Sequence, residues 1–171
     1  MNRGITFLAA CALAAGLSGC AQDKAGEQAS AAAQPAAEPK RETITGPAIA
    51  EDGDTVIIGD QSIDLWGVEA PDLGSADGWY SRAALDRFIG ENGELVCIIK
   101  VKRKRARDQA VCSNNKVGDL GRAMLLNGWA VVARRDKQNK ELDTALVGVY
   151  ERTEQRARQT RAGLWTNFPL K

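Results

Sequence analysis

An acid-rich stretch, residues 45–72, constrains the fold of this chain more than any other part of the sequence. It contains seven carboxylates and no Lys or Arg. Two short runs rich in β-branched residues, 55–58 and 63–68, are separated by the turn pair Gly59-Asp60. Such runs on either side of a Gly-Asp turn predict a β-hairpin that carries acidic residues at both ends.

These carboxylates predict a cation site. Carboxylates that meet at adjoining strand ends repel one another unless a cation lies between them. A set of oxygen ligands suits Ca²⁺ or Mg²⁺ better than Zn²⁺. A solvent-exposed acidic edge made of ordinary turn residues is the alternative. The acidic residues concerned are Glu51, Asp52, Asp54, Asp60, Asp64, Glu69 and Asp72.

The first 19 residues have the pattern of a lipoprotein signal peptide. Arg3 supplies positive charge, and residues 5–17 form an apolar run that is too short for a comfortable membrane span. Leu17-Ser-Gly-Cys20 follows and resembles the bacterial lipobox, in which the Cys is lipidated. We expect lipidated Cys20 to anchor an exported protein in the bacterial cell envelope, with the outer membrane favoured by Ala21. An ordinary secretory signal or a buried apolar helix is the alternative.

Residues 20–42 are predicted to be a disordered tether, followed by a folded domain at 43–171. The tether contains mostly Ala, Gln, Glu, Pro and Lys and cannot bury enough apolar surface to fold. The remaining length suits one domain with a single core. Without Arg3 the chain has 22 basic and 22 acidic residues, so nucleic-acid binding would need a local basic patch.

The rest of the domain alternates strand and helix patterns. A first strand is expected at 43–50, and the helices end at glycines. The further expected elements are a loop at 73–78, a helix at 79–90 with Trp79 on its apolar side and ended by Gly90 or Gly93, strands at 95–101 and 108–112, a helix at 120–127 capped by Gly118 or Asp119 and closed by Gly128, and a last helix at 141–160 stopped by Gly163.

Two cysteines remain after the signal peptide and Cys20 are accounted for. An exported compartment is oxidising, so Cys97 and Cys112 are expected to form a disulfide. If they face each other across an antiparallel pair of the strands at 95–101 and 108–112, the bond joins both strands of a hairpin. Two buried thiols are the alternative.

The tip of that hairpin is the densest basic cluster of the chain, Lys-Arg-Lys-Arg-Ala-Arg at residues 102–107. Lys102, Arg103 and Arg105 are candidate ligands for an anionic substrate, whereas a solubilising hairpin tip is the alternative. The chain contains no His. Its absence excludes Ser-His-Asp hydrolases, Cys-His proteases and nucleases with His-bound metals.

Four blocks, in matching order and spacing, resemble the thermonuclease (staphylococcal-nuclease-like) family. Asp52-Gly-Asp-Thr matches its metal-site motif, and Leu65-Trp-Gly-Val-Glu-Ala-Pro-Asp is similar to its second motif. The pair Asp119-Leu-Gly-Arg and Asn127-Gly-Trp-Ala, and the segment up to Gly163-Leu-Trp, resemble its later blocks. The resemblance covers residues 43–166 and implies an α+β fold, an OB-type five-stranded β-barrel with three helices.

The resemblance also implies calcium-dependent hydrolysis of phosphodiester bonds in DNA or RNA. Asp54 stands at the principal metal ligand of the family and Glu69 at the second ligand. Asp72 stands where the family has a general-base Glu, and its side chain is one methylene shorter. Positioning errors near 1 Å can lower a rate about 10²-fold, so this difference matters.

The chain departs from the family at the two arginines that hold the phosphate. The first position carries Asp64, a charge reversal. Counting back from Cys112, the second falls on Arg107, although Arg103 or Arg105 could serve instead. Loss of one preorganised charge donor typically costs ~2.7–4 kcal/mol of transition-state stabilisation.

Two functions of different classes follow. Asp54 and Arg107 favour a lipid-anchored thermonuclease with altered site chemistry. Asp64 and Asp72 favour a catalytically inactive nuclease-fold lipoprotein that acts as a binding module at the cell envelope. A structural envelope lipoprotein without a ligand is a third possibility.

Overall fold

The computed structural model describes residues 41–133 and 144–167. The predicted signal peptide, Cys20, nearly all of the tether and the start of the predicted last helix lie outside these residues. The elements are β1 (Thr43–Ala50), β2 (Thr55–Ile58), β3 (Gln61–Leu65), β4 (Val68–Glu69), α1 (Ala76–Ile89), β5 (Glu94–Val101), β6 (Asp108–Asn114), β7 (Gly118–Asp119), α2 (Leu120–Leu126), β8 (Val131–Val132), α3 (Thr144–Gln159) and the 3₁₀ turn η1 (Gly163–Asn167).

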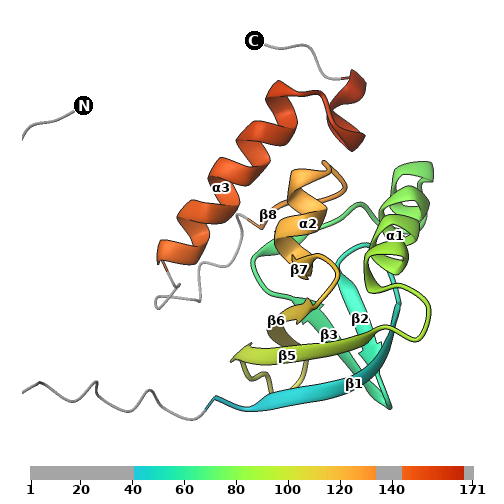
Figure 1. Cartoon of the computed structure of the whole chain (residues 1–171), viewed down its shortest axis with the longest axis vertical. Coiled ribbons are helices and arrows are strands. Elements are labelled where there is room, and N and C mark those ends of the chain that lie inside the picture. The colour runs from blue at the N-terminus through green and yellow to red at the C-terminus, as the bar shows by residue number, and fades with distance from the viewer. Residues whose placement is uncertain (1–40, 134–143, 168–171) are drawn as a thin grey trace, which may run out of the picture. The chain divides into compact units, whose positions relative to one another are not determined.

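Five strands close into a barrel, with the helices on one side of it (Figure 1). The sheet order is β3-β2-β1-β5-β6-β7, with antiparallel neighbours. Parallel pairing of β3 with β6, in which Leu65 lies opposite Ala110, closes β1, β2, β3, β5 and β6 into the barrel. This closed barrel with three helices confirms the predicted OB-type α+β fold.

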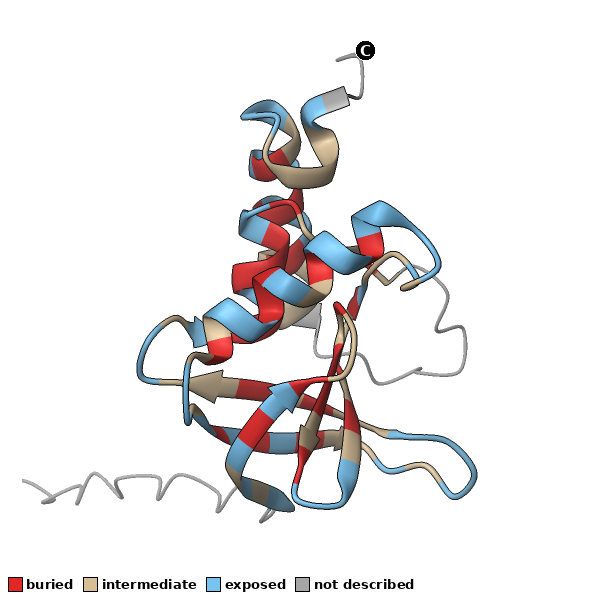
Figure 2. Ribbon diagram, turned by 90° about the vertical axis from the view of Figure 1, so that its right-hand side faces the viewer, coloured by how far each residue is buried: buried red, intermediate tan, exposed pale blue. Residues whose placement is uncertain are grey.

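The core lies inside the barrel and between the barrel and the helices. Figure 2 shows buried and exposed residues alternating along the strands, as expected where one face of each strand points inward. Leu85 of α1, Met124 of α2 and Tyr150 of α3 are each fully buried. All three helices are therefore fastened to one core cluster.

The predicted hairpin is present as β2 and β3, with Gly59 in the left-handed conformation at its turn. The expected second strand at 63–68 is wrong as a single element. The chain turns at Gly67, whose φ is +75°, so that β3 ends at Leu65 and β4 pairs instead with β8.

The second hairpin is also confirmed, and a disulfide joins Cys97 to Cys112 within it. Ile99 pairs with Ala110 but Val101 pairs with Gln109, so Lys100 is an extra residue in a β-bulge. Bulges change the direction of a side chain. Lys100 Nζ lies 5.9 Å from the ring centroid of buried Trp66.

Helix α1 begins earlier than expected, so the predicted loop at 73–78 is wrong in its second half. Ser75 caps the helix, since its Oγ accepts the backbone N–H of Gly78 at 3.1 Å. Gly90, rather than Gly93, follows the last helical residue. The cap of α2 is Asp119, with Gly128 in the left-handed position after its end, as expected.

Helix α3 ends at Gln159, before the predicted stop at Gly163. Arg161 adopts a left-handed conformation with φ of +53°, which ends helical geometry two residues earlier. Gly163 instead opens the 3₁₀ turn η1.

Candidate functional site

The acid loop, residues Glu51–Asp54, connects β1 to β2. The backbone N–H of Glu51 donates to Thr55 at 2.9 Å, and that of Asp54 donates to Asp52 Oδ1 at 3.0 Å. A Cβ added to Gly53 would lie 2.6 Å from the Cβ atoms of both Ala70 and Ser81. Since real side chains do not approach so closely, the acid loop can pack here only because residue 53 is Gly.

Asp54 is tied to two other segments. Its Oδ2 accepts the N–H of Ala70 at 2.7 Å, and its backbone oxygen accepts the N–H of Leu65 at 2.7 Å. Thr55 Oγ1 lies 3.4 Å from Asp54 Oδ1 and 3.3 Å from Asp64 Oδ1. The carboxylates of Asp54 and Asp64 thus lie on either side of one hydroxyl group.

Burial and neighbouring acids shift the pKa values of this cluster. Burial raises the pKa of Asp54 to about 7, and the charges of Asp52 and Asp64 add to that effect. Burial also raises the pKa of Asp64, although Arg107 and Arg103 oppose it. Burial acts on Asp52 too, but hydrogen bonds with Asp54 and Thr55 hold its pKa below the usual value. The cluster therefore favours uptake of a proton or a cation.

Arg107 reaches the acid cluster from the segment just before β6. Its guanidinium lies 2.6 Å from Glu51 Oε1 and 3.8 Å from Asp64 Oδ1. The other oxygen of Glu51, Oε2, is buried without a hydrogen-bond partner. The structure therefore pairs predicted residue Arg107 with Glu51 and Asp64, and Asp64 lies across the Thr55 hydroxyl from Asp54.

The other two predicted acids lie apart from this network. Asp72 is exposed before α1, where its carbonyl accepts the N–H and the Oγ–H of Ser75 at 3.1 and 2.9 Å. Glu69 is exposed in β4, where its backbone pairs with Val131. Within residues 41–133 and 144–167, neither carboxylate shares a hydrogen bond with Asp54.

The donor set fits the predicted Ca²⁺ in chemistry and only partly in number. All candidate ligands are oxygens, which hard cations prefer. In the part of the chain that the structure describes, no group of three or more His, Cys, Asp or Glu residues is placed to hold a metal ion. The contacting side chains of Asp52 and Asp54 offer two carboxylates, and water and phosphate oxygens would have to complete the shell.

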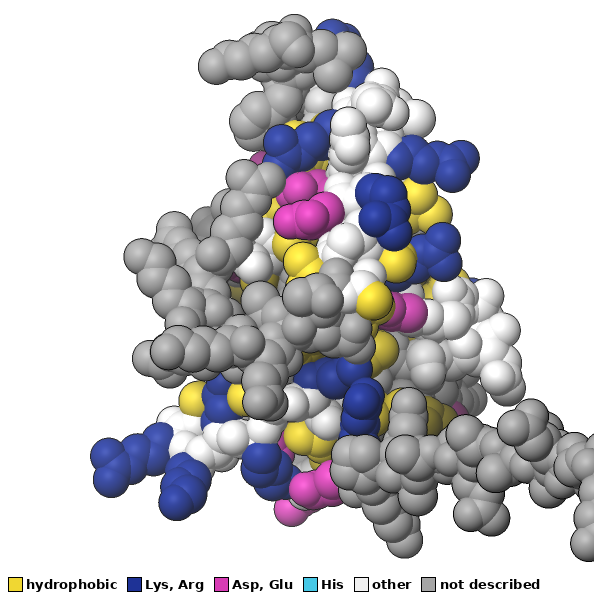
Figure 3. Space-filling view, turned by 90° about the vertical axis from the view of Figure 1, so that its left-hand side faces the viewer, with side chains coloured by type: hydrophobic (Ala, Val, Ile, Leu, Met, Phe, Trp, Pro, Cys, Tyr) yellow, Lys and Arg dark blue, Asp and Glu magenta, His cyan; other side chains and the backbone are white. Residues whose placement is uncertain are grey.

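The basic hairpin tip, residues 102–107, is held largely by acids. Lys102 Nζ lies 2.8 Å from both Glu42 Oε1 and Asp108 Oδ2, and these partners raise the pKa of Lys102. The backbone N–H of Arg103 donates to Asp108 Oδ1 at 2.8 Å, and Arg105 is exposed. Lys and Arg side chains project from the lower left of the face of the molecule that Figure 3 shows. Substrate binding by Lys102, Arg103 and Arg105 stays a prediction.

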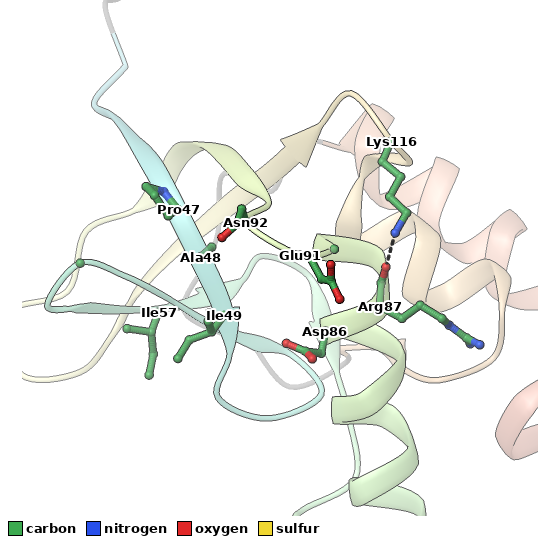
Figure 4. A pocket seen from close by; sticks show the side chains of 11 residues that line it. Pro47, Ala48, Ile49, Ile57, Asp86, Arg87, Glu91, Asn92 and Lys116 are labelled. Carbon is green, nitrogen blue, oxygen red and sulfur yellow. Dashed lines mark hydrogen bonds between the residues drawn. The ribbon is translucent and has the colours of Figure 1, made fainter.

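A separate open pocket of about 630 Å³ lies between β1, the β2 end and the C-terminal end of α1 (Figure 4). Ile49 and Ile57 line one wall and Asp86 and Glu91 the other. None of the predicted site residues lines this pocket. The acid cluster is therefore a surface site rather than part of this cavity.

Sequence reasoning missed two residues beside the acid loop. Arg82 Nε donates to the carbonyl of Ala50 at 3.3 Å, directly before Glu51. Trp79, which the periodicity places on the apolar side of its helix, is 55% exposed instead. The i, i+3 spacing of these two residues was the available signal that they share one face of a helix.

No helix within the described segments has the length and apolar character needed to cross a bilayer. No model of a known protein family matches the chain.

One curated protein is similar over most of its length. The chain is 31% identical over 138 residues to the succinoglycan biosynthesis protein ExoI of Rhizobium meliloti (strain 1021). The aligned region covers 75% of this chain and 68% of that protein. At this identity and coverage, the chain belongs to the same family as ExoI.

Proposed function

We propose that this domain is a calcium-dependent phosphodiesterase of the thermonuclease type that acts on DNA or RNA with a weakened active site. One observation carries the proposal. Asp54 lies half-buried among other acids, and Arg107 is drawn into the same cluster at Asp64. A candidate cation ligand and a candidate phosphate ligand thus belong to one cluster, and this juxtaposition supports the proposal.

Each predicted residue has a role in this proposal. Asp54, with Asp52 or Glu69, would hold the cation, which when bound would polarise a phosphate oxygen. Arg107 would release its ion pair with Glu51 and bind a phosphate oxygen. It would then stabilise the negative charge that develops on that oxygen. Asp72 would orient or deprotonate the attacking water. No step requires His.

Asp64 is the reason to expect slow catalysis. An acid at this position repels a phosphate and also competes with it for Arg107, to which it lies 3.8 Å away. Losing one charge donor typically lowers kcat about 10²–10³-fold. An acid in its place should lower it further.

The test is cleavage of fluorescent single-stranded DNA and RNA by the full chain with Cys20→Ser, which prevents lipidation. We expect slow cleavage in Ca²⁺ that a chelator abolishes and Asp54→Ala removes. Absence of cleavage, or cleavage that persists in Asp54→Ala, would contradict the proposal.

A second variant separates a weakened site from a lost one. Asp64→Arg should raise the cleavage rate by up to about 10²-fold, because it restores a charge donor beside Asp54. If a folded Asp64→Arg protein gains nothing in Ca²⁺, the site has lost function at more than one position.

The 2.6 Å pair between Arg107 and Glu51 favours a second candidate, a catalytically inactive binding module at the cell envelope. An arginine whose charge is already neutralised by acids is less available to bind a phosphate. Succinoglycan biosynthesis, the process in the relative's name, is one that a binding module could serve. Wild-type protein that binds polyanions but cleaves none would support this candidate.

We further propose that lipidated Cys20 anchors the domain in the bacterial cell envelope, with the outer membrane favoured. More than one acyl chain gives stable anchoring. In membrane fractions of expressing cells, wild-type protein should sediment with outer membranes and Cys20→Ser should not. Equal sedimentation of both proteins would contradict the anchor.

A further inference from the structure

The first turns of α1 expose two large aromatic side chains that the proposed mechanism does not use. Trp79 is 55% exposed and Tyr80 is 61% exposed. The other large hydrophobic side chains that are exposed in the described part of the chain are aliphatic. Exposed Trp and Tyr side chains are enriched at binding interfaces.

The start of α1 is fastened to the acid loop. Ser81, the residue after Tyr80, packs against Gly53 and is buried. Its Oγ donates to the carbonyl of Trp129 at 2.7 Å, which holds this turn of the helix in place. The aromatic residues therefore have a fixed position relative to Asp54.

Arg82 connects Trp79 to the acid loop. Its Nε donates to the carbonyl of Ala50, and its guanidinium carbon lies 5.7 Å from the ring centroid of Trp79. Arg82 thus contacts both the Trp79 ring and Ala50, the residue directly before Glu51. The ring of Tyr80 instead packs against the ring of Trp129, with centroids 6.2 Å apart.

We propose that Trp79 and Arg82 form a subsite that holds one nucleotide of single-stranded nucleic acid, with the base on Trp79 and the phosphate at Arg82. The inference rests on the proposed function, since the subsite would lead the strand to Asp54. Exposed aromatic rings stack on bases of any sequence, and arginine is a strong phosphate ligand.

Charge and strand geometry favour this occupant. Arg107 contacts Glu51 and Arg82 contacts Ala50, so cationic side chains from the hairpin and from α1 meet at the start of the acid loop and can attract a polyanion. Bases of a duplex are already stacked on one another, whereas those of a single strand can turn toward a ring.

The test measures binding by the full chain with Cys20→Ser in the presence of chelator, so that no cleavage occurs. The probes are a fluorescent oligothymidylate of about 12 nucleotides and an abasic oligonucleotide of equal length. Trp79→Ala should weaken binding of the first roughly 5- to 150-fold and leave binding of the second unchanged. Trp79→Phe should retain most of the affinity.

Leu126→Ala is the matched control, because Leu126 is an exposed apolar residue on α2. It should leave the affinity unchanged. Arg82→Gln should reduce the slope of log affinity against log salt by about 0.7–1, whereas Trp79→Ala should leave that slope unchanged. Thermal unfolding midpoints verify that each variant is folded.

Three outcomes would overturn the subsite: no oligonucleotide binding by wild type, unchanged binding by folded Trp79→Ala, or an equal loss on the abasic probe. Trp79-dependent binding of a soluble glucan without binding of oligothymidylate would assign the ring to sugars instead. Trp79-dependent binding without cleavage in Ca²⁺ would leave the subsite standing and contradict the phosphodiesterase. Cleavage in Ca²⁺ together with binding that does not depend on Trp79 would support the phosphodiesterase and contradict the subsite.

Discussion

The acid loop and the basic hairpin tip carry opposite charges on one barrel and are built in opposite ways. Asp54 in the acid loop is partly buried and fixed by backbone hydrogen bonds to β3 and to Ala70. Lys102 in the tip is exposed and held by side-chain ion pairs. Burial strengthens electrostatic effects, whereas exposed pairs contribute little. Of these two regions, the acid loop is therefore the one whose side chains are held in a fixed arrangement.

Arg107 is where the two regions meet. It belongs to the basic hairpin tip in sequence and to the acid cluster in space, through Glu51 and Asp64. Its ion pairs reduce both the positive charge that Arg107 can offer to an anion and the negative charge of Glu51 and Asp64.

The largest expected effect is the pH dependence caused by Asp54. Its pKa rises from 3.8 to about 7 on folding, so the folded state binds the proton more tightly and stability falls as pH rises from about 4 through 7. Relative to Asp54→Asn, wild type should lose up to roughly 4 kcal/mol at about 1.36 kcal/mol per pKa unit, less after solvent screening. Urea unfolding in chelator between these pH values measures it, and parallel curves would contradict it.

Removal of the disulfide tests the stem beneath the basic hairpin tip. Cys97 and Cys112 are 15 residues apart and buried, so the double variant Cys97→Ala, Cys112→Ala should lose ~3 kcal/mol of unfolding free energy. Wild type in a reducing agent should show a similar loss by chemical denaturation. Unchanged stability in both would mean that the hairpin needs no bond.

Gly53→Ala tests the packing of the acid loop. The added Cβ would lie 2.6 Å from Ala70 and Ser81, so we expect a loss of about 1–3 kcal/mol. Gly74→Ala is the matched control, because no atom lies within 4 Å of its added Cβ. Equal unfolding midpoints for the two variants would show that the acid loop is not tightly packed.

The smallest effects concern single charges. Arg107→Gln should cost about 1 kcal/mol or less, because both partners are partly exposed, and should raise the pKa of Asp64 further. Lys104→Gln in the exposed tip should change stability by less than about 0.5 kcal/mol. Carboxylate titration by NMR follows Asp64. A larger effect from Lys104 than from Arg107 would reverse the comparison between the regions.

Local patterns predicted the hairpins because their signals lie within a few residues. Gly59 marks the first turn, and Cys97 and Cys112 occupy facing positions that an antiparallel register explains. Helix α1 was harder, since its cap at Ser75 is followed by Ala-Asp-Gly and not by an apolar run. Trp79 matched the helical spacing, but α1 packs through Ala84, Leu85 and Ile89, so Trp79 is left at the surface.

The resemblance to thermonucleases names Asp54 and Arg107 as candidate site residues, and these roles stay predictions. The arrangement of the cluster could not be predicted. That Arg107 pairs with Glu51, or that Arg82 reaches Ala50, could not be read from residues that are far apart in the chain.

The sequence by itself determined the two hairpins and the disulfide partners, because these depend on residues close together along the chain. The tertiary structure decided the protonation tendency of Asp54, the pairing of Arg107 and the exposure of Trp79. Each of these depends on barrel closure between β3 and β6 and on the docking of α1. Burial and electrostatic neighbours exist only once distant segments have met.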